Sequence, residues 1–136
     1  MSIDPRLNAA LEPVLADLRR TLDLEFALEP SQWSEVRGQL TAMMRGRDGS
    51  GMGVSIMAAD DDSQRVVSIT DQVQEFVIEA LWKDGRPATW PECPAHPATH
   101  PLKPVDHHVR PPWVCPASGQ AKFAIGALGA YGRVSD

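Results

Sequence analysis

The strongest structural signal in this chain is the stretch from Asp60 to Gly85, which reads DDDSQRVVSITDQVQEFVIEALWKDG. Its first residues are acidic or hydroxylated, which suits a helix N-terminus because their oxygens cap free backbone N–H groups. Lys83 and Gly85 suit the C-terminus, as a cation and a glycine cap. Between them, apolar residues recur every three or four positions and mark one face. These are Val66, Ile69, Val73, Phe76, Val77, Ala80 and Leu81. The pattern predicts a helix over Ser63–Asp84.

The residues just before this helix predict a small antiparallel sheet. Residues 25–29 alternate weakly, as in a short strand. The segment 33–44 fits either a helix or a strand, and Gly38 favours the strand because glycine costs a helix interior about 1 kcal/mol. Residues 47–51 read as a turn and residues 53–58 as the returning strand. We expect the apolar face of the long helix to pack on this sheet, which gives an α+β fold.

The N-terminal segment predicts helical structure over residues 5–22. Asp4 followed by Pro5 is a typical helix start, and leucine and valine then recur at spacings of three and four. Pro13 interrupts this pattern, because proline lacks the N–H group that a helix interior needs. We therefore expect either one kinked helix or two short ones.

Composition and charge narrow the class of protein. The 136 residues are 43% hydrophobic and 23% charged, with a net charge of −5. No apolar run approaches the roughly 20 residues that span a bilayer, and the N-terminus does not resemble a secretory signal, so we expect a cytoplasmic protein without membrane contact. Arginine outnumbers lysine ten to three, which favours a bacterial source. Neither half carries a cluster of cations, so a nucleic-acid partner is disfavoured.

The composition changes sharply after residue 86. Nine of the twelve prolines, both cysteines and all four histidines lie between Pro87 and Pro116. A segment so rich in proline cannot form a continuous helix, and it has too few large apolar residues for a core of its own. We therefore divide the chain into an α+β domain over 1–86, a module over 87–130 that packs on it, and a tail over 131–136.

The two cysteines of this module begin similar short motifs. The first reads Cys93-Pro94-Ala95-His96 and the second Cys115-Pro116-Ala117-Ser118-Gly119. Over residues 90–128 the module resembles a zinc ribbon, whose two ligand-bearing turns, or knuckles, read CPxC and CPxCG. The resemblance implies a β module in which His96 takes the second ligand position and Ser118 the fourth, with residues 121–128 as the last strand. Residues 65–128 also resemble small bacterial proteins. Because no activity is assigned to those proteins, this resemblance implies no reaction.

Serine is a poor zinc ligand, so the knuckles supply three good donors: Cys93, His96 and Cys115. Zinc prefers four ligands in a tetrahedron, and we expect His100 to be the fourth. His107 or His108 is the alternative. With three protein ligands and a water molecule, the site would instead resemble a catalytic one, and Ser118 would serve as a hydrogen-bonding neighbour.

Two further features concern the long helix and its neighbours. Trp82, Trp90 and Trp113 lie near the boundary between the two parts, and we expect them to pack between the parts. Glu75 and Glu79 are one helical turn apart, and we interpret them as a solvated helix face.

The sequence thus favours a non-enzymatic binding or adaptor protein that contacts another protein and uses zinc as a structural element. The first alternative is a zinc-dependent hydrolase in which three ligands leave room for a reactive water. A weaker alternative is a ribbon that binds nucleic acid, for which only Lys103, Arg110, Lys122 and Arg133 supply positive charge.

Overall fold

The described residues fold into two helices and two small antiparallel sheets, as expected for an α+β protein. A computed structural model describes residues 2–31, 33, 36–107 and 109–129. In chain order the elements are α1 (Pro5–Thr21), β1 (Phe26–Pro30), β2 (Gln39–Gly46), β3 (Gly51–Met57), α2 (Asp62–Lys83), β4 (Lys103–Pro104), β5 (Pro112–Val114) and β6 (Ala121–Ala124). The predicted order of N-terminal helix, sheet and long helix is confirmed.

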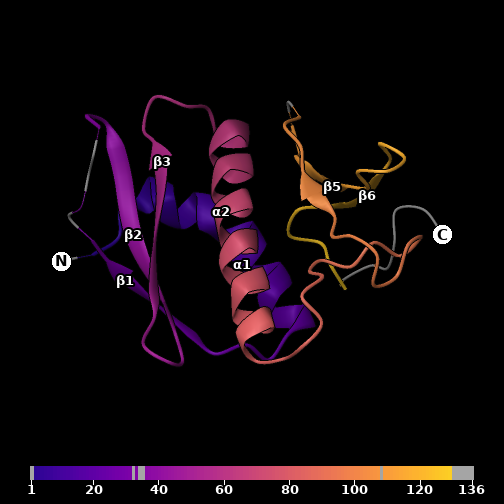
Figure 1. Cartoon of the computed structure of the whole chain (residues 1–136). Helices are drawn as coiled ribbons and strands as arrows, with labels where there is room; N and C mark the ends of the chain where they lie inside the picture. Colours follow the sequence, from indigo (N-terminus) through magenta and orange to yellow (C-terminus); the bar gives the residue numbers. More distant parts are fainter. Residues whose placement is uncertain (1, 32, 34–35, 108, 130–136) are drawn as a thin grey trace.

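Helix α2 lies between the two sheets (Figure 1). The sheet β1-β2-β3 lies on one side of it, and the smaller sheet β4-β5-β6 lies on the other. Buried apolar side chains from both helices and from both sheets join in one continuous core. Neither helix in the described part of the chain has the length and apolar character needed to cross a membrane. The division at residue 86 stays a prediction.

The first sheet presents one apolar face to the helices. Ala42 and Met44 on β2 are buried, and so are Val54 and Ile56 on β3. Ala42 pairs with Val54 in the antiparallel register, so these side chains share one face of the pleat. The strand interpretation of residues 33–44 is confirmed for the part that β2 covers, and the helix alternative is wrong.

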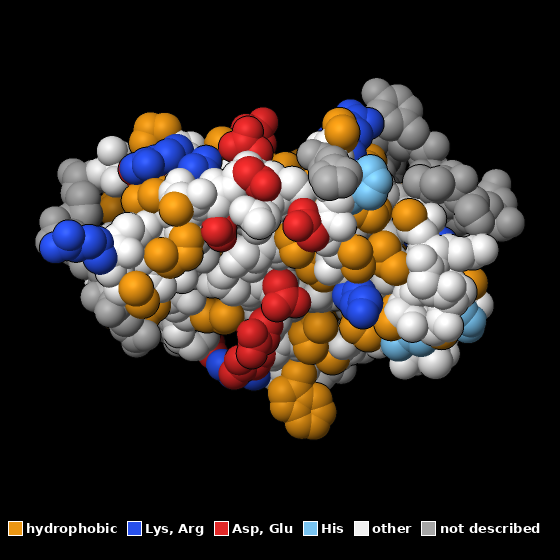
Figure 2. All heavy atoms as spheres, turned by 90° about the horizontal axis from the view of Figure 1, so that it is seen from above, with side chains coloured by type: hydrophobic (Ala, Val, Ile, Leu, Met, Phe, Trp, Pro, Cys, Tyr) orange, Lys and Arg blue, Asp and Glu red, His pale blue; other side chains and the backbone are white. Residues whose placement is uncertain are grey.

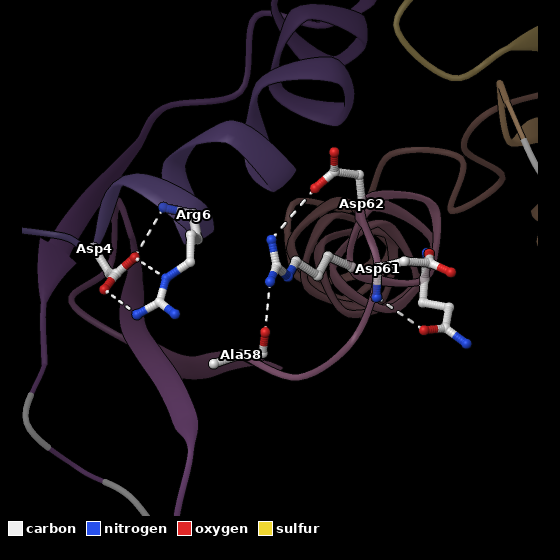
Figure 3. A network of polar contacts seen from close by, with 7 residues as sticks. Asp4, Arg6, Ala58, Asp61 and Asp62 are labelled. Carbon is white, nitrogen blue, oxygen red and sulfur yellow. Dashed lines mark hydrogen bonds and ion pairs between the residues drawn. The ribbon is translucent and has the colours of Figure 1, made fainter.

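Side-chain caps fix the start of both helices (Figure 3). The Asp4 carboxylate accepts a hydrogen bond from the backbone N–H of Arg6 at 2.8 Å, with Pro5 in the first helical turn. At the start of α2, Asp61 and Gln64 each accept a hydrogen bond from the other's backbone N–H, at 2.8 and 3.0 Å. This reciprocal capping box satisfies two N–H groups that lack partners within the helix. The predicted acidic cap is confirmed, with Asp61 as the capping residue.

The other end of α2 closes on the predicted glycine. The N–H of Gly85 donates to the carbonyl of Trp82 at 3.1 Å, and the N–H of Arg86 donates to that of Leu81 at 2.9 Å. Gly85 has a φ of +67°, a conformation that side chains with a Cβ adopt at a cost. Helix α1 contains Pro13 and still runs unbroken to Thr21, so the alternative of two short helices is wrong.

The small sheet beyond α2 is shorter than predicted. The last strand, β6, ends at Ala124 rather than near Leu128, and Leu128 is buried beyond the strand. Trp113 on β5 is fully buried and packs edge to face on Trp90, with ring centroids 5.7 Å apart. The expectation that Trp82 joins them is wrong, because Trp82 is 73% exposed.

A buried carboxylate on α1 ties the C-terminal part of the chain to the helices. Asp17 is fully buried and accepts hydrogen bonds from the indole N–H of Trp113 at 2.8 Å, and from the backbone N–H groups of Gly126 at 2.7 Å and Leu128 at 2.9 Å. Burial raises the pKa of this carboxyl, and the three donors oppose the rise. Both oxygens of Asp17 thus serve as acceptors for donors that lie about a hundred residues further along the chain.

Replacing Asp17 with asparagine should lower the free energy of unfolding by about 2 kcal/mol. The amide group puts a donor where a carboxylate oxygen accepts, so at least one buried N–H loses its partner. Urea unfolding followed by tryptophan fluorescence measures the loss. Glu12→Gln, an exposed change on the same helix, should stay within about 0.5 kcal/mol of the parent. Equal stability of the two variants would contradict the anchoring role.

Candidate metal centre

The first knuckle lies in the loop that connects α2 to β4. Glu92 and Pro101 form an isolated antiparallel bridge, and the N–H of Leu102 donates to the carbonyl of Pro91 at 2.8 Å. The chain therefore leaves and returns at adjacent points, with the knuckle between them. Within it, the N–H of His96 donates to the carbonyl of Cys93 at 3.1 Å, which closes a tight turn. This turn brings residues three apart to the same side of the loop.

The second knuckle lies between β5 and β6. The N–H of Gly119 donates to the carbonyl of Cys115 at 2.8 Å, and the N–H of Cys115 donates to that of Gln120 at 2.9 Å. Gly119 has a φ of +73°, as its place at the end of the predicted knuckle requires. Cys115 is fully buried, whereas Ser118 is exposed at the tip of the turn.

The two knuckles bring together the four residues that the sequence singled out. One ligand atom from each of Cys93, His96, His100 and Cys115 lies within 4.8 Å of all the others. His96 Nδ1 is 3.5 Å from the sulfur of Cys93 and 3.6 Å from the sulfur of Cys115. In a regular tetrahedron of zinc ligands, a sulfur and a nitrogen are about 3.5 Å apart. The two distances from His96 to the sulfurs therefore match a tetrahedral zinc site, and all four residues lie close enough together to hold one metal ion.

His100 has one ring nitrogen without a partner. Its Nδ1 lies 3.3 Å from the carbonyl oxygen of Pro101, an acceptor that favours the tautomer with the proton on Nδ1. Its Nε2 is buried and has no hydrogen-bond partner in the described part of the chain. A metal-binding histidine commonly donates its other ring N–H to a carbonyl group in this way. The buried lone pair on Nε2 is thus suited to bind a cation.

The environment of Cys115 favours its thiolate form. The Ser118 hydroxyl, which hydrogen-bonds the sulfur, makes the largest contribution. The backbone N–H groups of Ser118 and Ala117 and the thiol of Cys93 add to it, whereas burial acts in the opposite direction. Together these groups lower the pKa of the Cys115 thiol to about 6. Ser118 thus favours the thiolate of Cys115, in line with the second of the two roles considered for it.

His107, one of the two alternatives for the fourth ligand, lies outside the cluster. His107 is exposed, and its carbonyl oxygen accepts a hydrogen bond from the hydroxyl of Ser63 at the start of α2. His107 does not belong to the Cys/His group found in the described residues. His108 lies outside the described residues.

One residue that positions this site was not anticipated. Gln74 on α2 is buried, and its side-chain amide donates to the carbonyls of Trp90 at 3.1 Å and Leu102 at 2.6 Å. These two carbonyls flank the loop that carries the first knuckle, so Gln74 fixes the loop at both ends. The only signal in the sequence is a polar residue at the edge of the apolar helix face, which by itself is typical of a solvated position.

Comparison with known proteins gives no relative. No protein family, no curated protein and no solved structure matches this chain. The resemblance to zinc ribbons and the bacterial source gain no support from these comparisons. The case for the site depends on the chemistry of the Cys/His cluster.

Replacing Ser118 with alanine should weaken zinc binding in a pH-dependent way. Without the hydroxyl, the pKa of Cys115 rises toward its ordinary value of 9.0, and protons compete more strongly for the sulfur. We expect the apparent zinc affinity near neutral pH to fall about tenfold, and the difference to vanish in alkaline solution, where both proteins hold the thiolate.

Competition against a chromophoric chelator at several pH values measures this difference. Ser118→Thr keeps a hydroxyl and should behave like the parent. A loss of affinity that is the same at every pH would show that Ser118 acts on the fold rather than on the thiol.

Proposed function

We propose that Cys93, His96, His100 and Cys115 bind one structural zinc ion in a non-enzymatic binding protein. The observation that carries this proposal is the buried Nε2 of His100, which has no hydrogen-bond partner among the described residues and lies in a cluster with two thiols and a second imidazole. An unpaired buried nitrogen costs about 1–3 kcal/mol, and a bound cation would remove that cost.

The donor set favours zinc over other common cations. Two sulfurs and two imidazole nitrogens in a tetrahedral arrangement are typical of zinc, whereas calcium and magnesium prefer oxygen ligands. The lowered pKa of Cys115 agrees with this choice, because a thiol must be deprotonated to bind zinc.

A structural role follows from the number of ligands and from the composition of the module. Four protein ligands complete a tetrahedron and leave no position for a reactive water. The module is rich in proline and has few large apolar side chains, so it has little to gain from burial alone. A structural zinc site can contribute on the order of 10 kcal/mol to folding, which is enough to order such a segment.

The hydrolase alternative has less support. It needs a carboxylate base free to act near the metal. Glu92 is the nearest in sequence, and its carboxylate accepts the N–H of Ala98 at 3.0 Å. The other candidate, Asp106, accepts the hydroxyl of Ser63 at 2.6 Å. Both carboxylates are thus engaged in holding loops.

The nucleic-acid alternative also has less support. Lys122, one of the few cations of the module, is 5% exposed, and its ammonium group donates to the side chain of Gln120 at 3.1 Å. Lys103 and Arg110 are exposed, and Arg133 lies outside the described residues. Among the described residues of the module, two exposed cations do not make the stripe that phosphate backbones require. A protein partner therefore fits the acidic surface best.

Elemental analysis of the purified protein after zinc loading and dialysis tests the site. We expect about one zinc per chain in the parent and substantial depletion in Cys93→Ser and in His100→Ala, because each removes one of four ligands. His107→Ala is the matched control and should keep its zinc. Chelation should also lower the melting temperature of the parent.

The outcomes separate the alternatives. Absence of zinc from the loaded parent contradicts the proposal. Zinc retained by His100→Ala but lost from Cys93→Ser indicates three protein ligands, which would favour the hydrolase.

A further inference from the structure

Helix α2 has a second face, which carries an exposed tryptophan. The buried face holds residues such as Val73, Val77 and Leu81. Trp82 lies on a different side and is 73% exposed, although a large aromatic side chain gains most from burial. The residues that line a shallow groove with it are Asp71, Gln74, Glu75, Ile78 and Glu79.

This groove is acidic along its length. Asp71, Glu75 and Glu79 are all exposed. Glu79 has a cationic neighbour, since its carboxylate lies 3.6 Å from the ammonium group of Lys83. Neither Asp71 nor Glu75 has an ion-pair partner among the residues that the structure describes. Figure 2 shows acidic side chains in a band across the middle of the molecule, which reaches a projecting hydrophobic side chain at the lower edge.

One wall of the groove is fixed by the metal-site loop. Gln74 lines the groove, and its side-chain amide is turned inward to hold Trp90 and Leu102. The groove therefore lies on a helix that is packed on both sides, by β3 and by the C-terminal module, rather than on a mobile segment. A rigid surface loses little entropy when a ligand binds to it.

We propose that this groove on α2 binds a basic segment of a partner protein, one that contains arginine or lysine. This inference rests on the proposed binding role and names the partner's chemistry. Arginine or lysine side chains would pair with Asp71 and Glu75, and one would stack on the face of Trp82 as a cation–π contact. From Asp71 to Trp82 the helix rises about 16 Å, which matches about five residues of extended chain.

Other occupants fit this charge less well. The carboxylates repel nucleic-acid phosphates and anionic lipid head groups alike. Two copies of this groove placed face to face would bring like charges together, in a chain whose net charge is −5. A basic peptide satisfies both the exposed indole ring and the carboxylates of Asp71 and Glu75, which have no ion-pair partner in the described part of the chain.

Fluorescence anisotropy with a labelled peptide of alternating arginine and glycine tests the inference on the zinc-loaded chain of 136 residues. We expect Trp82→Ala to weaken binding about fivefold and Trp82→Phe to lie between it and the parent. The double variant Asp71→Asn with Glu75→Gln should weaken binding about tenfold at low salt, where the contribution of the charges is largest.

The matched control is Glu12→Gln with Glu25→Gln, which removes the same charge from exposed positions outside the groove. It should bind within about twofold of the parent. The inference is overturned if this control weakens binding as much as the double variant, since the protein's overall charge then attracts the peptide. It is also overturned if Trp82→Ala binds like the parent, or if the peptide does not bind at all.

Zinc content, measured on the same samples, distinguishes a failure of this inference from a failure of the proposed metal site. The groove variants should all retain zinc, because none of the substituted residues is a proposed ligand. Should the loaded parent hold no zinc and still bind the peptide through Trp82, the metal site would fail while the groove stood. A groove variant that misfolds would show a changed circular dichroism spectrum. The inference is then tested with whichever groove variant, Trp82→Ala or the double variant, keeps the parent spectrum.

Discussion

The buried carboxylate of Asp17 holds the C-terminal part of the chain in place. Three N–H donors, from Trp113, Gly126 and Leu128, converge on it from β5 and from the turns beyond β6. A carboxylate inside a protein is costly unless its oxygens are hydrogen-bonded, and these N–H groups need acceptors just as much. If the carboxylate and its donors moved apart, both would be left buried without hydrogen-bond partners. The segment from Trp113 to Leu128 is thus held in one position on α1.

The metal centre depends on that commitment. Trp113 holds β5 on α1, and Gln74 holds the loop of the first knuckle on α2, so the two knuckles lie side by side. Four donors then lie within 4.8 Å of one another although the ligands span 23 positions of the chain, from Cys93 to Cys115. A bound zinc would link the four donors to one another, while the hydrogen bonds of Asp17 and Gln74 hold the segments that carry them.

Helix α2 connects the site to the proposed binding groove. Its apolar face packs in the core, Gln74 at the edge of that face holds the knuckle loop, and the next stripe around the helix carries Asp71, Glu75 and Trp82. The proposed zinc would therefore bear on the proposed recognition as well, because it would stabilise the module that packs along this helix.

The sequence by itself determined the structural features that depend on residues close together in the chain. The start and end of α2, the turn into β3 and the knuckle glycine are set by backbone conformation and by caps a few residues away, so they were predictable. The members of the Cys/His cluster could be predicted too, because cysteine and histidine are the side chains that structural zinc sites most often use. Asp17, Gln74 and Trp82 were not, since each is a common residue on a helix and its burial depends on distant segments. Only the tertiary structure decided that two of them lie inside and the third outside, because that outcome follows from how the C-terminal module packs against the helices.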